Sequence, residues 1–315
     1  MSENNLPAKG ENTLPAMTAQ NEAHRSGFVN IVGNPNVGKS TLMNDLVGER
    51  VSIITSKAQT TRHRIMGIVN TPEYQIVFSD TPGVLKPKYK LQESMLDFSE
   101  GALTDADVLL YVTDVVEEPL KNADFLKKVA GEKVPVLLVI NKIDLLKNNA
   151  ELDALVSRWQ ELLPKAEIFP TSAKEHFNVA NLMARIVELL PAGEPYYGKD
   201  ALTDKPARFF VTEIIREKIL LNYDKEIPYS TEVIVEKFDE KEKSLHIMAV
   251  VYVERDSQKG ILIGRGGSML KRVGMEARKD IEKFFDKSVY LEIFVKVEPD
   301  WRNRENKLRS FGYIE

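Results

Sequence analysis

The sequence predicts an α/β fold in two parts, a three-layer domain followed by a smaller α+β domain. A glycine-rich stretch at residues 33–40 follows an apolar, strand-like run and precedes a helical pattern. Strand and helix patterns then alternate up to residue 190, which is typical of a mostly parallel sheet with helices on both faces. After residue 206 the order becomes helix, strand, strand, helix, glycine-rich loop, helix and strand, which indicates a separate α+β unit.

The composition permits two ordinary domains in a reducing compartment. The 315 residues suffice for two hydrophobic cores, and no cysteine is present. Disulfides, thiolate metal sites and cysteine nucleophiles are therefore excluded. The net charge of −4 is unevenly divided, because residues 206–315 carry 21 Lys and Arg against 20 Asp and Glu while the rest carries 22 against 27. The last third is thus nearly neutral and the remainder is acidic.

Residues 1–26 are predicted to be a disordered N-terminal extension. They are polar, and they lack the basic start and the apolar centre of a signal peptide. The chain also has no apolar run of the length that crosses a membrane. We therefore expect a cytoplasmic protein.

Residues 33–40 have the pattern of a phosphate-binding loop. The two glycines allow successive backbone N–H groups to point inward, and the following helix adds the positive end of its dipole. We expect polyphosphate here, with Lys39 on the β- and γ-phosphates and the Ser40 hydroxyl on a bridging Mg²⁺. The predicted binding residues are Gly33, Asn34, Pro35, Asn36, Val37, Gly38, Lys39 and Ser40.

Asp80-Thr81-Pro82-Gly83 follows a predicted hairpin of strands at residues 65–70 and 74–79. An acidic residue at the carboxyl end of a strand beside the phosphate loop is suited to hold a Mg²⁺ water, so Asp80 is a predicted metal residue. Gly83 lets a backbone N–H approach the γ-phosphate, because glycine has no side chain to block it.

Asn141-Lys142-Ile143-Asp144 ends the strand predicted at residues 134–140. The Asp144 carboxylate can accept two hydrogen bonds from the N1–H and N2–H₂ groups of guanine, a pair that adenine does not offer. The alternative role for Asp144 is a helix N-cap. Further along the chain, the backbone of Ser172-Ala173-Lys174 is predicted to contact the guanine O6.

These elements, in this order, resemble a translation-factor-type P-loop GTPase with a Ras-like fold. The stretches Gly-Asn-Pro-Asn-Val-Gly-Lys-Ser, Gln59-Thr60-Thr61-Arg62, Asp80-Thr81-Pro82-Gly83 and Asn141-Lys142-Ile143-Asp144 are similar to those of the Era branch. The resemblance implies GTP and GDP as ligands and Mg²⁺-dependent hydrolysis of GTP to GDP and phosphate. It also implies that a threonine of residues 55–64 completes the Mg²⁺ shell, with Thr61 as the choice and Thr60 as the rival.

Val84 departs from the pattern of many small GTPases, which place a glutamine after this Asp-x-x-Gly element to orient the attacking water. An apolar side chain cannot orient water, so we expect slow hydrolysis. In related branches a K⁺ ion held by a phosphate-loop asparagine supplies charge, and Asn36 matches that position. The alternative is that Asn36 makes a hydrogen bond that only stabilises the loop. Lys39, Asn36, Thr61 and Gly83 are thus the predicted catalytic residues, with K⁺ stimulation as a hypothesis.

Residues 191–206 are rich in Pro and Gly and are predicted to be a linker. Later in the domain that follows this linker, a second glycine-rich loop occurs. Gly264-Arg265-Gly266-Gly267 lies between two helical patterns, and residues 260–279 carry five basic side chains against Glu276 alone. A concentrated basic patch in a neutral domain indicates a specific groove for nucleic acid. With its flanking elements, the loop resembles that of a type II KH domain, which implies that it clamps about four nucleotides of a single strand.

The KH resemblance also implies the residues that bind RNA. Ile261 and Ile263 are expected to contact bases, while the loop clamps phosphates. The predicted RNA-binding residues are Ile261, Ile263, Gly264, Arg265, Gly266, Gly267, Lys271 and Arg272. For Lys271 and Arg272 the alternative is a solvated helix face. The basic and aromatic tail either extends the RNA surface or caps the domain.

A Ras-like GTPase domain followed directly by a type II KH domain is the architecture of the Era family, and the resemblance covers about residues 27–315. We expect a GTPase domain at 27–190, a linker at 191–206, a KH domain at 207–298 and a tail at 299–315. The family implies a monomer that binds the 3′ end of 16S ribosomal RNA and acts in assembly of the small (30S) ribosomal subunit.

Two alternatives remain open from the sequence. One is a membrane-peripheral regulatory GTPase on the inner face of the cell membrane, and the other is an RNA scaffold that binds GTP without productive hydrolysis. For the switch itself, we expect the γ-phosphate to order residues 55–64 and the loop after Gly83, and we expect those loops to meet the KH domain or the linker.

Overall fold

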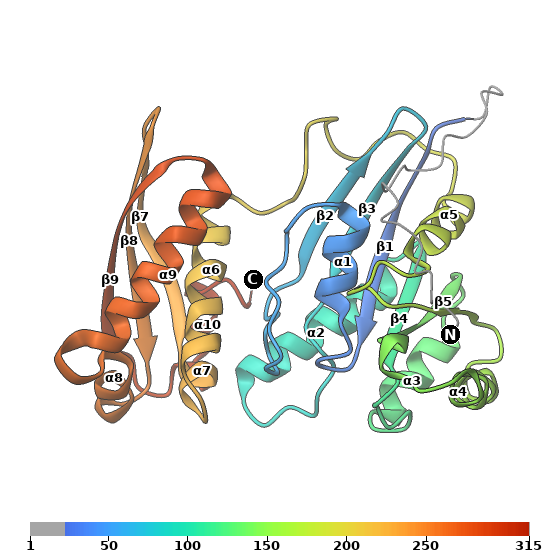
Figure 1. Cartoon of the computed structure of the whole chain (residues 1–315), viewed down its shortest axis with the longest axis horizontal. Coiled ribbons are helices and arrows are strands. Elements are labelled where there is room, and N and C mark those ends of the chain that lie inside the picture. The colour runs from blue at the N-terminus through green and yellow to red at the C-terminus, as the bar shows by residue number, and fades with distance from the viewer. Residues whose placement is uncertain (1–22, 315) are drawn as a thin grey trace, which may run out of the picture.

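The structure is a computed structural model that describes residues 23–314, and it contains two separate sheets (Figure 1). The predicted extension lies outside the described residues up to residue 22. Arg25 and Ser26, which the prediction assigned to the extension, instead begin the first strand and pair with Tyr74 and Gln75. That boundary was placed too late, because polar residues at the end of a strand show no apolar pattern and are ordered by a partner distant in sequence.

Helices cover both faces of the first sheet, as the sequence predicts. Its elements are β1 (Arg25–Gly33), α1 (Lys39–Val47), β2 (Ile65–Asn70), β3 (Tyr74–Asp80), α2 (Lys90–Thr104), β4 (Val108–Asp114), α3 (Ala123–Gly131), β5 (Val136–Asn141), η1 (Ile143–Leu145), α4 (Asn149–Leu162), β6 (Glu167–Pro170) and α5 (Val179–Leu189). The strand order is β2-β3-β1-β4-β5-β6, and only the β2–β3 hairpin is antiparallel. Because the chain moves to opposite sides of β1, the carboxyl ends of β1 and β4 open a crevice there.

Each face of this sheet has its own core. On one face, α1 and α5 contribute side chains such as Leu42 and Leu182. On the other face, α2, α3 and α4 contribute Leu103, Phe125 and Trp159. β4 is buried at every position, as expected of a strand that helices cover on both sides.

The second sheet has the order β7-β8-β9, and helices pack against one face of it (Figure 1). Its elements are α6 (Ala207–Asn222), α7 (Ile227–Ser230), β7 (Glu232–Glu240), β8 (Ser244–Val253), α8 (Asp256–Ile263), η2 (Arg265–Gly267), α9 (Ser268–Phe285) and β9 (Ser288–Val297). β7 and β8 are antiparallel, with an irregularity between Val235 and Lys237, whereas β8 and β9 are parallel. The core of this part lies between the sheet and the pair α6 and α9.

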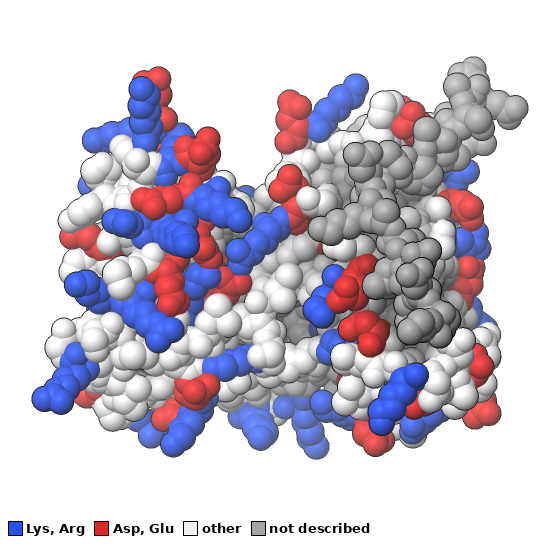
Figure 2. Space-filling view, in the orientation of Figure 1, with Lys and Arg blue, Asp and Glu red and all other residues white. Residues whose placement is uncertain are grey.

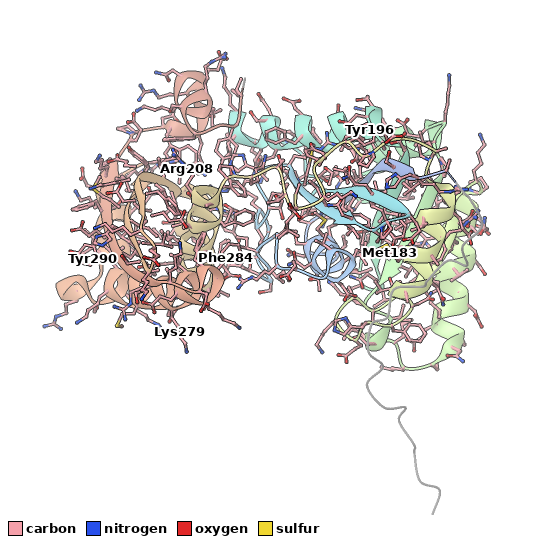
Figure 3. The ribbon with its side chains drawn as sticks, turned by 90° about the horizontal axis from the view of Figure 1, so that it is seen from above. Met183, Tyr196, Arg208, Lys279, Phe284 and Tyr290 are labelled. Carbon is pink, nitrogen blue, oxygen red and sulfur yellow. The ribbon has the colours of Figure 1, made fainter. Side chains whose placement is uncertain are left out.

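Residues 191–206 run along the first sheet. The backbone N–H of Ile68 in β2 donates to the carbonyl of Leu202 at 2.8 Å. Near the start of the segment, the Tyr196 ring packs 4.8 Å from the Phe28 ring of β1 (Figure 3). The segment therefore satisfies backbone groups of β2, which is an edge strand of the six-stranded sheet.

The described part of the C-terminal tail lies at the junction of the two parts. It forms η3 (Trp301–Asn303) and α10 (Glu305–Ser310). Trp301, Leu308 and Tyr313 form a cluster with Leu91 and Met95 of α2. The tail therefore packs against the first domain, a role that neither sequence-based alternative contained.

Across residues 23–314, no helix is both long enough and apolar enough to cross a membrane.

Candidate functional site

The phosphate-binding loop lies between β1 and α1, at the carboxyl edge of the sheet. Gly33 and Gly38 have φ angles of 146° and 93°, which favour glycine. A Cβ atom at Gly33 would lie 2.1 Å from the Val112 carbonyl oxygen, and one at Gly38 would lie 2.2 Å from the side-chain nitrogen of Asn141. Both glycines are therefore required by the close approach of β4 and β5.

Lys39 begins α1 and is almost fully buried. Its ammonium donates to the carbonyl oxygens of Gly33 and Asn34 at 3.1 and 2.9 Å, so the side chain folds back over the loop. Burial lowers the pKa of Lys39 to about 8, although the negative charges of Asp80 and Glu117 oppose the shift. A buried ammonium in a loop of backbone N–H groups is suited to bind phosphate oxygens.

Three oxygen atoms from separate elements meet beside Lys39. The Ser40 hydroxyl donates to Asp80 Oδ2 at 2.7 Å and lies 2.9 Å from the Thr61 hydroxyl, which in turn lies 3.4 Å from Asp80 Oδ2. Asp80 is fully buried, and its Oδ1 has no hydrogen-bond partner within residues 23–314. A buried carboxylate oxygen left without a partner is costly. The oxygen donors and the unpartnered Oδ1 therefore fit a Mg²⁺ ion.

The rival threonine faces elsewhere. The Thr60 hydroxyl donates to the Lys57 carbonyl oxygen at 2.6 Å and lies 2.6 Å from the Thr55 hydroxyl. It therefore satisfies hydrogen bonds within its own loop, while Thr61 faces Ser40 and Asp80. The geometry favours Thr61 over Thr60 as the metal ligand.

The stretch after Asp80 passes directly over the phosphate loop. A Cβ atom at Gly83 would lie 2.6 Å from the Pro35 Cα, so only glycine lets the two backbones come this close. Thr81 anchors the stretch by donating to the Ile31 carbonyl oxygen at 2.8 Å, and the Pro82 carbonyl accepts a hydrogen bond from Ser99.

Val84 points away from the cavity. Its side chain is 3% exposed and belongs to the core on the α2, α3 and α4 face of the sheet. Its backbone N–H donates to the Gly33 carbonyl at 3.1 Å. A side chain packed in the core cannot contact an attacking water. This agrees with the expectation from the sequence that Val84 cannot orient that water.

Asn141 connects the three loops at the other end of the cavity. Its side-chain nitrogen donates to the Val37 carbonyl at 2.9 Å, and its oxygen accepts from the Ala173 N–H at 3.0 Å. Lys142, at φ 63°, donates to the Asn36 carbonyl and to Asp114. These bonds hold the residues that the sequence predicts to read the base against the phosphate loop.

Asp144 lies in η1 and accepts a hydrogen bond from the Ser172 hydroxyl at 2.5 Å. Asn148, rather than Asp144, caps the next helix, because its side chain accepts from the Glu151 N–H. The alternative role of Asp144 as the helix cap is therefore not supported. Ile143 is partly buried and packs against the core on the α2, α3 and α4 face, and Lys174 is exposed and paired with Glu175 at 2.9 Å.

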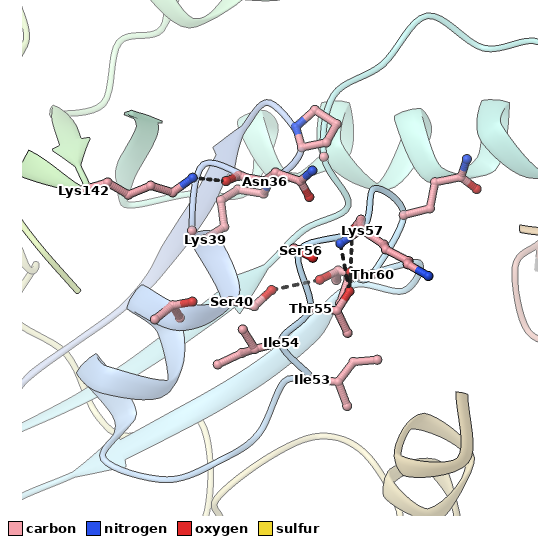
Figure 4. Close-up of a pocket in the computed structure, with 16 residues that line it drawn as sticks. Asn36, Lys39, Ser40, Ile53, Ile54, Thr55, Ser56, Lys57, Thr60 and Lys142 are labelled. Carbon is pink, nitrogen blue, oxygen red and sulfur yellow. Dashed lines mark hydrogen bonds between the residues drawn. The ribbon is translucent and has the colours of Figure 1, made fainter. Parts of the chain in front are cut away.

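A cavity of about 390 Å³ adjoins the metal and phosphate residues (Figure 4). It is lined by Pro35, Asn36, Gly38, Lys39, Ser40, Thr41, residues 53–57, Gln59, Thr60, Thr61, Gly83 and Lys142. Asn36 is exposed here, at φ 68°, and its side chain makes no hydrogen bond to the part of the chain that the structure describes. The alternative of a loop-stabilising side-chain bond is thus not seen in this region, and the K⁺ role of Asn36 stays a prediction.

The second glycine-rich loop forms η2 and leads into α9. Gly264, Gly266 and Gly267 have φ angles of 73°, 60° and 77°, and no atom lies within 4 Å of a Cβ built at Gly266 or Gly267. The loop surface is therefore open, and Arg265 is exposed within it. Figure 2 shows Lys and Arg side chains interspersed with Asp and Glu over this domain, so its charge is not of a single sign.

A groove of about 520 Å³ lies between α9 and β9, starting at this loop. It is lined by Gly267, Leu270, Lys271, Gly274, Met275, Arg278, Leu291 and Ile293. An apolar floor with two basic side chains at its margin suits a single strand, whose bases need apolar contact and whose phosphates need charge.

The predicted RNA residues divide into two sets around this groove. Gly267 and Lys271 line it, but Ile261 and Ile263 belong to α8 and are not among its lining residues. Arg272 points elsewhere on α9 and pairs with Glu276 at 3.0 Å, which favours the solvated-face alternative for this residue.

The groove residues that the sequence analysis missed share a helical spacing. On the α9 side, the lining positions form two series with intervals of three or four residues, which are 267, 270, 274 and 278, and 267, 271, 275 and 278. Such spacing places side chains on one face of a helix. A search for the helix face that continues from the glycine loop would have found Leu270 and Met275.

Comparison with known protein families gives two matches. A family described as 50S ribosome-binding GTPase matches residues 28–142, and a family described as KH domain matches residues 226–302. The first match contains the phosphate-binding loop, and the second contains the groove.

Known proteins are similar over nearly the whole chain. GTPase Era from Heliobacterium modesticaldum is 46% identical over 296 residues, which are 93% of this chain and 99% of that protein. A crystal structure of Era in complex with MgGDPNP and nucleotides 1506-1542 of 16S ribosomal RNA is 39% identical, with a TM-score of 0.88 over 93% of this chain and 100% of that one. A crystal structure of an Aquifex aeolicus Era variant bound to GDP.AlF4- has the same identity and TM-score over 92% of this chain and 100% of that one.

These findings confirm the predicted fold class, a P-loop GTPase domain followed by a KH domain, and the predicted family. They also agree with the position of the cavity, whose lining includes residues of the phosphate-binding loop. The chain belongs to the Era family of GTPases.

Proposed function

We propose that this chain is a GTPase switch that controls binding to ribosomal RNA. It binds GTP or GDP with Mg²⁺ beside α1, hydrolyses GTP slowly, and binds the single-stranded 3′ end of 16S ribosomal RNA through the groove beside α9. In this way it acts in assembly of the small ribosomal subunit. The observation that carries the proposal is the convergence of the Ser40, Thr61 and Asp80 oxygens beside the phosphate-binding loop.

The residues of the cavity have separate tasks at the phosphate end of the nucleotide. Lys39 and the loop N–H groups bind the β- and γ-phosphates, and the close approach at Gly83 brings a backbone N–H toward the γ-phosphate. Ser40, Thr61 and Asp80 hold Mg²⁺, directly or through water. When bound there, Mg²⁺ would supply positive charge that neutralises the β- and γ-phosphate oxygens and the charge that develops on the GDP leaving group.

Asp144 supplies the selection for guanine. The Ser172 hydroxyl occupies one carboxylate oxygen and orients the group. The guanine N1–H and N2–H₂ groups are the matching donors, whereas adenine would leave the carboxylate without a partner. Asn141 keeps this residue set in place relative to the phosphate loop.

Slow hydrolysis follows from the position of Val84 in the core, and K⁺ at Asn36 is the proposed source of the missing charge. GTP turnover should therefore be faster in KCl than in NaCl at equal ionic strength. The Asn36→Ser variant should lose most of this difference and retain GDP affinity. Equal turnover of the natural chain in the two salts would remove the K⁺ hypothesis.

The RNA assignment has two supports. The groove combines an apolar floor with Lys271 and Arg278, and the similar Era structure was solved with nucleotides 1506-1542 of 16S ribosomal RNA. The proposal includes the GTPase domain from Arg25 to about residue 190, the linker 191–206, the KH domain 207–298 and the tail 299–315. It also includes a monomeric, cytoplasmic protein, and the membrane-peripheral regulator at the inner face of the cell membrane is the alternative that the lipid test below addresses.

The test is the anisotropy of short, labelled single-stranded RNAs with GDP or a non-hydrolysable GTP analogue. We expect sequence-selective binding that is tighter with the GTP analogue and is lost in the Gly266→Asp variant. Gly48→Asp is the matched control, because Gly48 also has a positive φ and open space around its Cβ position. The proposal would be contradicted if RNA affinity were the same with GDP and with the GTP analogue, and the same in the natural chain and the Gly266→Asp variant.

Two further measurements address the alternatives. Multiple-turnover release of phosphate from GTP excludes the non-hydrolysing scaffold. Binding to anionic lipid vesicles in the absence of RNA binding would favour the membrane-peripheral regulator.

A further inference from the structure

The second domain holds the backbone on both sides of Thr61. Arg216 of α6 donates to the Gln59 carbonyl at 3.2 Å and also to the Thr60 carbonyl. On the other side, Arg62 extends into the second domain and donates to the carbonyl oxygens of Pro228 and Thr231 at 2.9 and 2.7 Å. Thr61 therefore lies between two arginine contacts that cross the domain interface.

These two arginines belong to a buried ionic cluster, defined here as Arg62, Arg216, Glu213, Glu232 and Tyr313. The four charged side chains are between 0% and 5% exposed. Arg62 pairs with Glu232 at 3.0 Å, Arg216 pairs with Glu213 at 2.6 Å, and the Tyr313 hydroxyl donates to Glu232 at 2.7 Å. The two positive and two negative charges of the cluster balance only when residues 59–62 are docked against the second domain. Withdrawal of Arg62 would leave Glu232 buried without its cation, which is strongly unfavourable.

The contacts continue along the same segment. Each basic Lys or Arg side chain within residues 50–62 reaches the second domain: Arg50 pairs with Glu217 of α6, Lys57 pairs with Asp224 just after α6 at 2.8 Å, and Arg62 pairs with Glu232 of β7. Four residues of this segment, Lys57, Gln59, Thr60 and Thr61, also line the nucleotide cavity. One stretch of chain therefore faces the nucleotide on one side and the second domain on the other.

We infer that the KH domain is part of the metal site, because Arg216 and Arg62 position the Thr61 hydroxyl against Ser40 and Asp80. Both arginines are positioning residues and touch neither nucleotide nor metal. This inference rests on the proposed function of the cavity. The inference adds to the proposed function that the Thr61 hydroxyl is held in place for Mg²⁺ only while the second domain is docked.

Thermodynamic linkage gives the inference a second consequence. If docking improves binding of Mg²⁺ and the GTP analogue, these ligands must stabilise docking by the same factor. GDP has no γ-phosphate and depends less on Thr61, so it should stabilise docking less. The relative position of the two domains would then report which nucleotide is bound.

The experiment measures the affinity of a fluorescent, non-hydrolysable GTP analogue at a series of Mg²⁺ concentrations, with fluorescent GDP in parallel. We expect Arg216→Met to weaken binding of the GTP analogue in Mg²⁺ by about tenfold, within the usual range for coupled sites, and to change GDP affinity by less than about twofold. Arg216→Lys should recover part of the loss, because a lysine keeps the charge opposite Glu213.

Arg302→Met is the matched control. Arg302 lies in the tail, pairs with Glu254 of the second domain, and also crosses to the first domain, where it lies 4.6 Å from the centre of the Tyr89 ring. It makes no contact with residues 59–62 in the part of the chain that the structure describes. Its substitution should leave the ratio of GTP-analogue to GDP affinity unchanged.

Hydrogen exchange on the unaltered protein gives a readout that does not depend on a variant. With Mg²⁺ and the GTP analogue, amides of residues 57–62 and of 229–232 should exchange more slowly together than with GDP. Equal exchange in the two states, or an unchanged affinity ratio in a folded Arg216→Met protein, would overturn the inference. If the unaltered protein shows no Mg²⁺-dependent binding of the GTP analogue, the proposed function of the cavity fails as well.

Discussion

The nucleotide cavity and the RNA groove are built in opposite ways. At the nucleotide site, the predicted phosphate and metal residues are buried: Lys39, which lines the cavity, is 6% exposed, and Asp80, which lies beside Ser40, is 0% exposed. In the groove, the apolar side chain of Met275 is 55% exposed and Lys271 is on the surface. A buried polar group needs a partner at a fixed place, whereas an exposed groove needs only suitable groups along one helix face. Single substitutions should therefore have large effects in the cavity and small effects in the groove.

The largest effect is expected from Asp80→Asn. The amide keeps the size of the side chain but removes the charge that faces the metal position, so the affinity for a GTP analogue in Mg²⁺ should fall about 100-fold, or about 2.7 kcal/mol. Isothermal titration measures this change. Asp97→Asn, at an exposed position of α2, is the control and should have no effect. A loss of less than about threefold would place the metal elsewhere and would weaken the contrast between the two sites.

Asp144→Asn should have the next largest effect and should change which base is preferred. An asparagine offers a donor where the aspartate offers only acceptors, so it repels the guanine N1–H and N2–H₂ groups and accommodates the C2 carbonyl of xanthine. GTP affinity should fall about 30-fold, and the affinity for xanthosine triphosphate should rise. Competition binding with both nucleotides checks this. Asp153→Asn on α4 should preserve the preference for GTP, and an unaltered preference in Asp144→Asn would mean that another group reads the base.

A smaller effect is expected in the groove from Lys271→Ala. Loss of one phosphate contact should weaken RNA binding about fivefold, equally for different sequences, and should reduce the slope of log affinity against log salt by about 0.7. Anisotropy titrations at several salt concentrations measure both quantities. Lys279→Ala, on the same helix but outside the groove, is the control. If both variants weaken binding equally, the charge acts as a general surface rather than as a groove.

The smallest effect concerns His63, which lies where the two domains meet. Its ring stacks 4.3 Å from that of Tyr313, and burial, with the nearby charge of Arg216, lowers its pKa to about 3. The folded protein therefore keeps His63 neutral, while the unfolded chain takes up a proton near pH 6.5. This contribution to stability is present above pH 6.5 and is lost progressively as the pH falls toward 3.

Between pH 7 and pH 6 the loss from His63 should be about 0.7 kcal/mol of unfolding free energy. Denaturant unfolding at the two pH values measures it, with His63→Phe as the comparison because phenylalanine keeps the ring and cannot titrate. An identical pH dependence in the two proteins would show that His63 is protonated in the folded state.

The local motifs could be recognised without a structure because each is a short, contiguous set of residues. Gly33 and Gly38 are needed where a Cβ atom would collide with neighbouring strands, and their spacing with Lys39 and Ser40 indicates a phosphate loop wherever a strand precedes it and a helix follows. The order of strands and helices likewise predicted the mostly parallel sheet with helices on both faces and the separate α+β unit. Arg25 and Ser26 were misassigned because polar residues at a strand end give no periodic signal.

Other features depend on how distant segments pack. Thr60 and Thr61 are the same amino acid in adjacent positions, so the sequence does not distinguish them. Only the path of the loop against α6 turns Thr61 toward Asp80. The groove arises where α9 meets β9, so Leu291 and Ile293 become its wall only after the sheet has formed. The tail packs on α2 for the same reason. A motif is recognisable because its residues are neighbours along the chain. In contrast, which threonine faces Asp80, what forms the wall of the groove and where Arg62 docks all depend on contacts between distant residues. In the widest case, Arg62 with Glu232, about 170 positions separate the two partners.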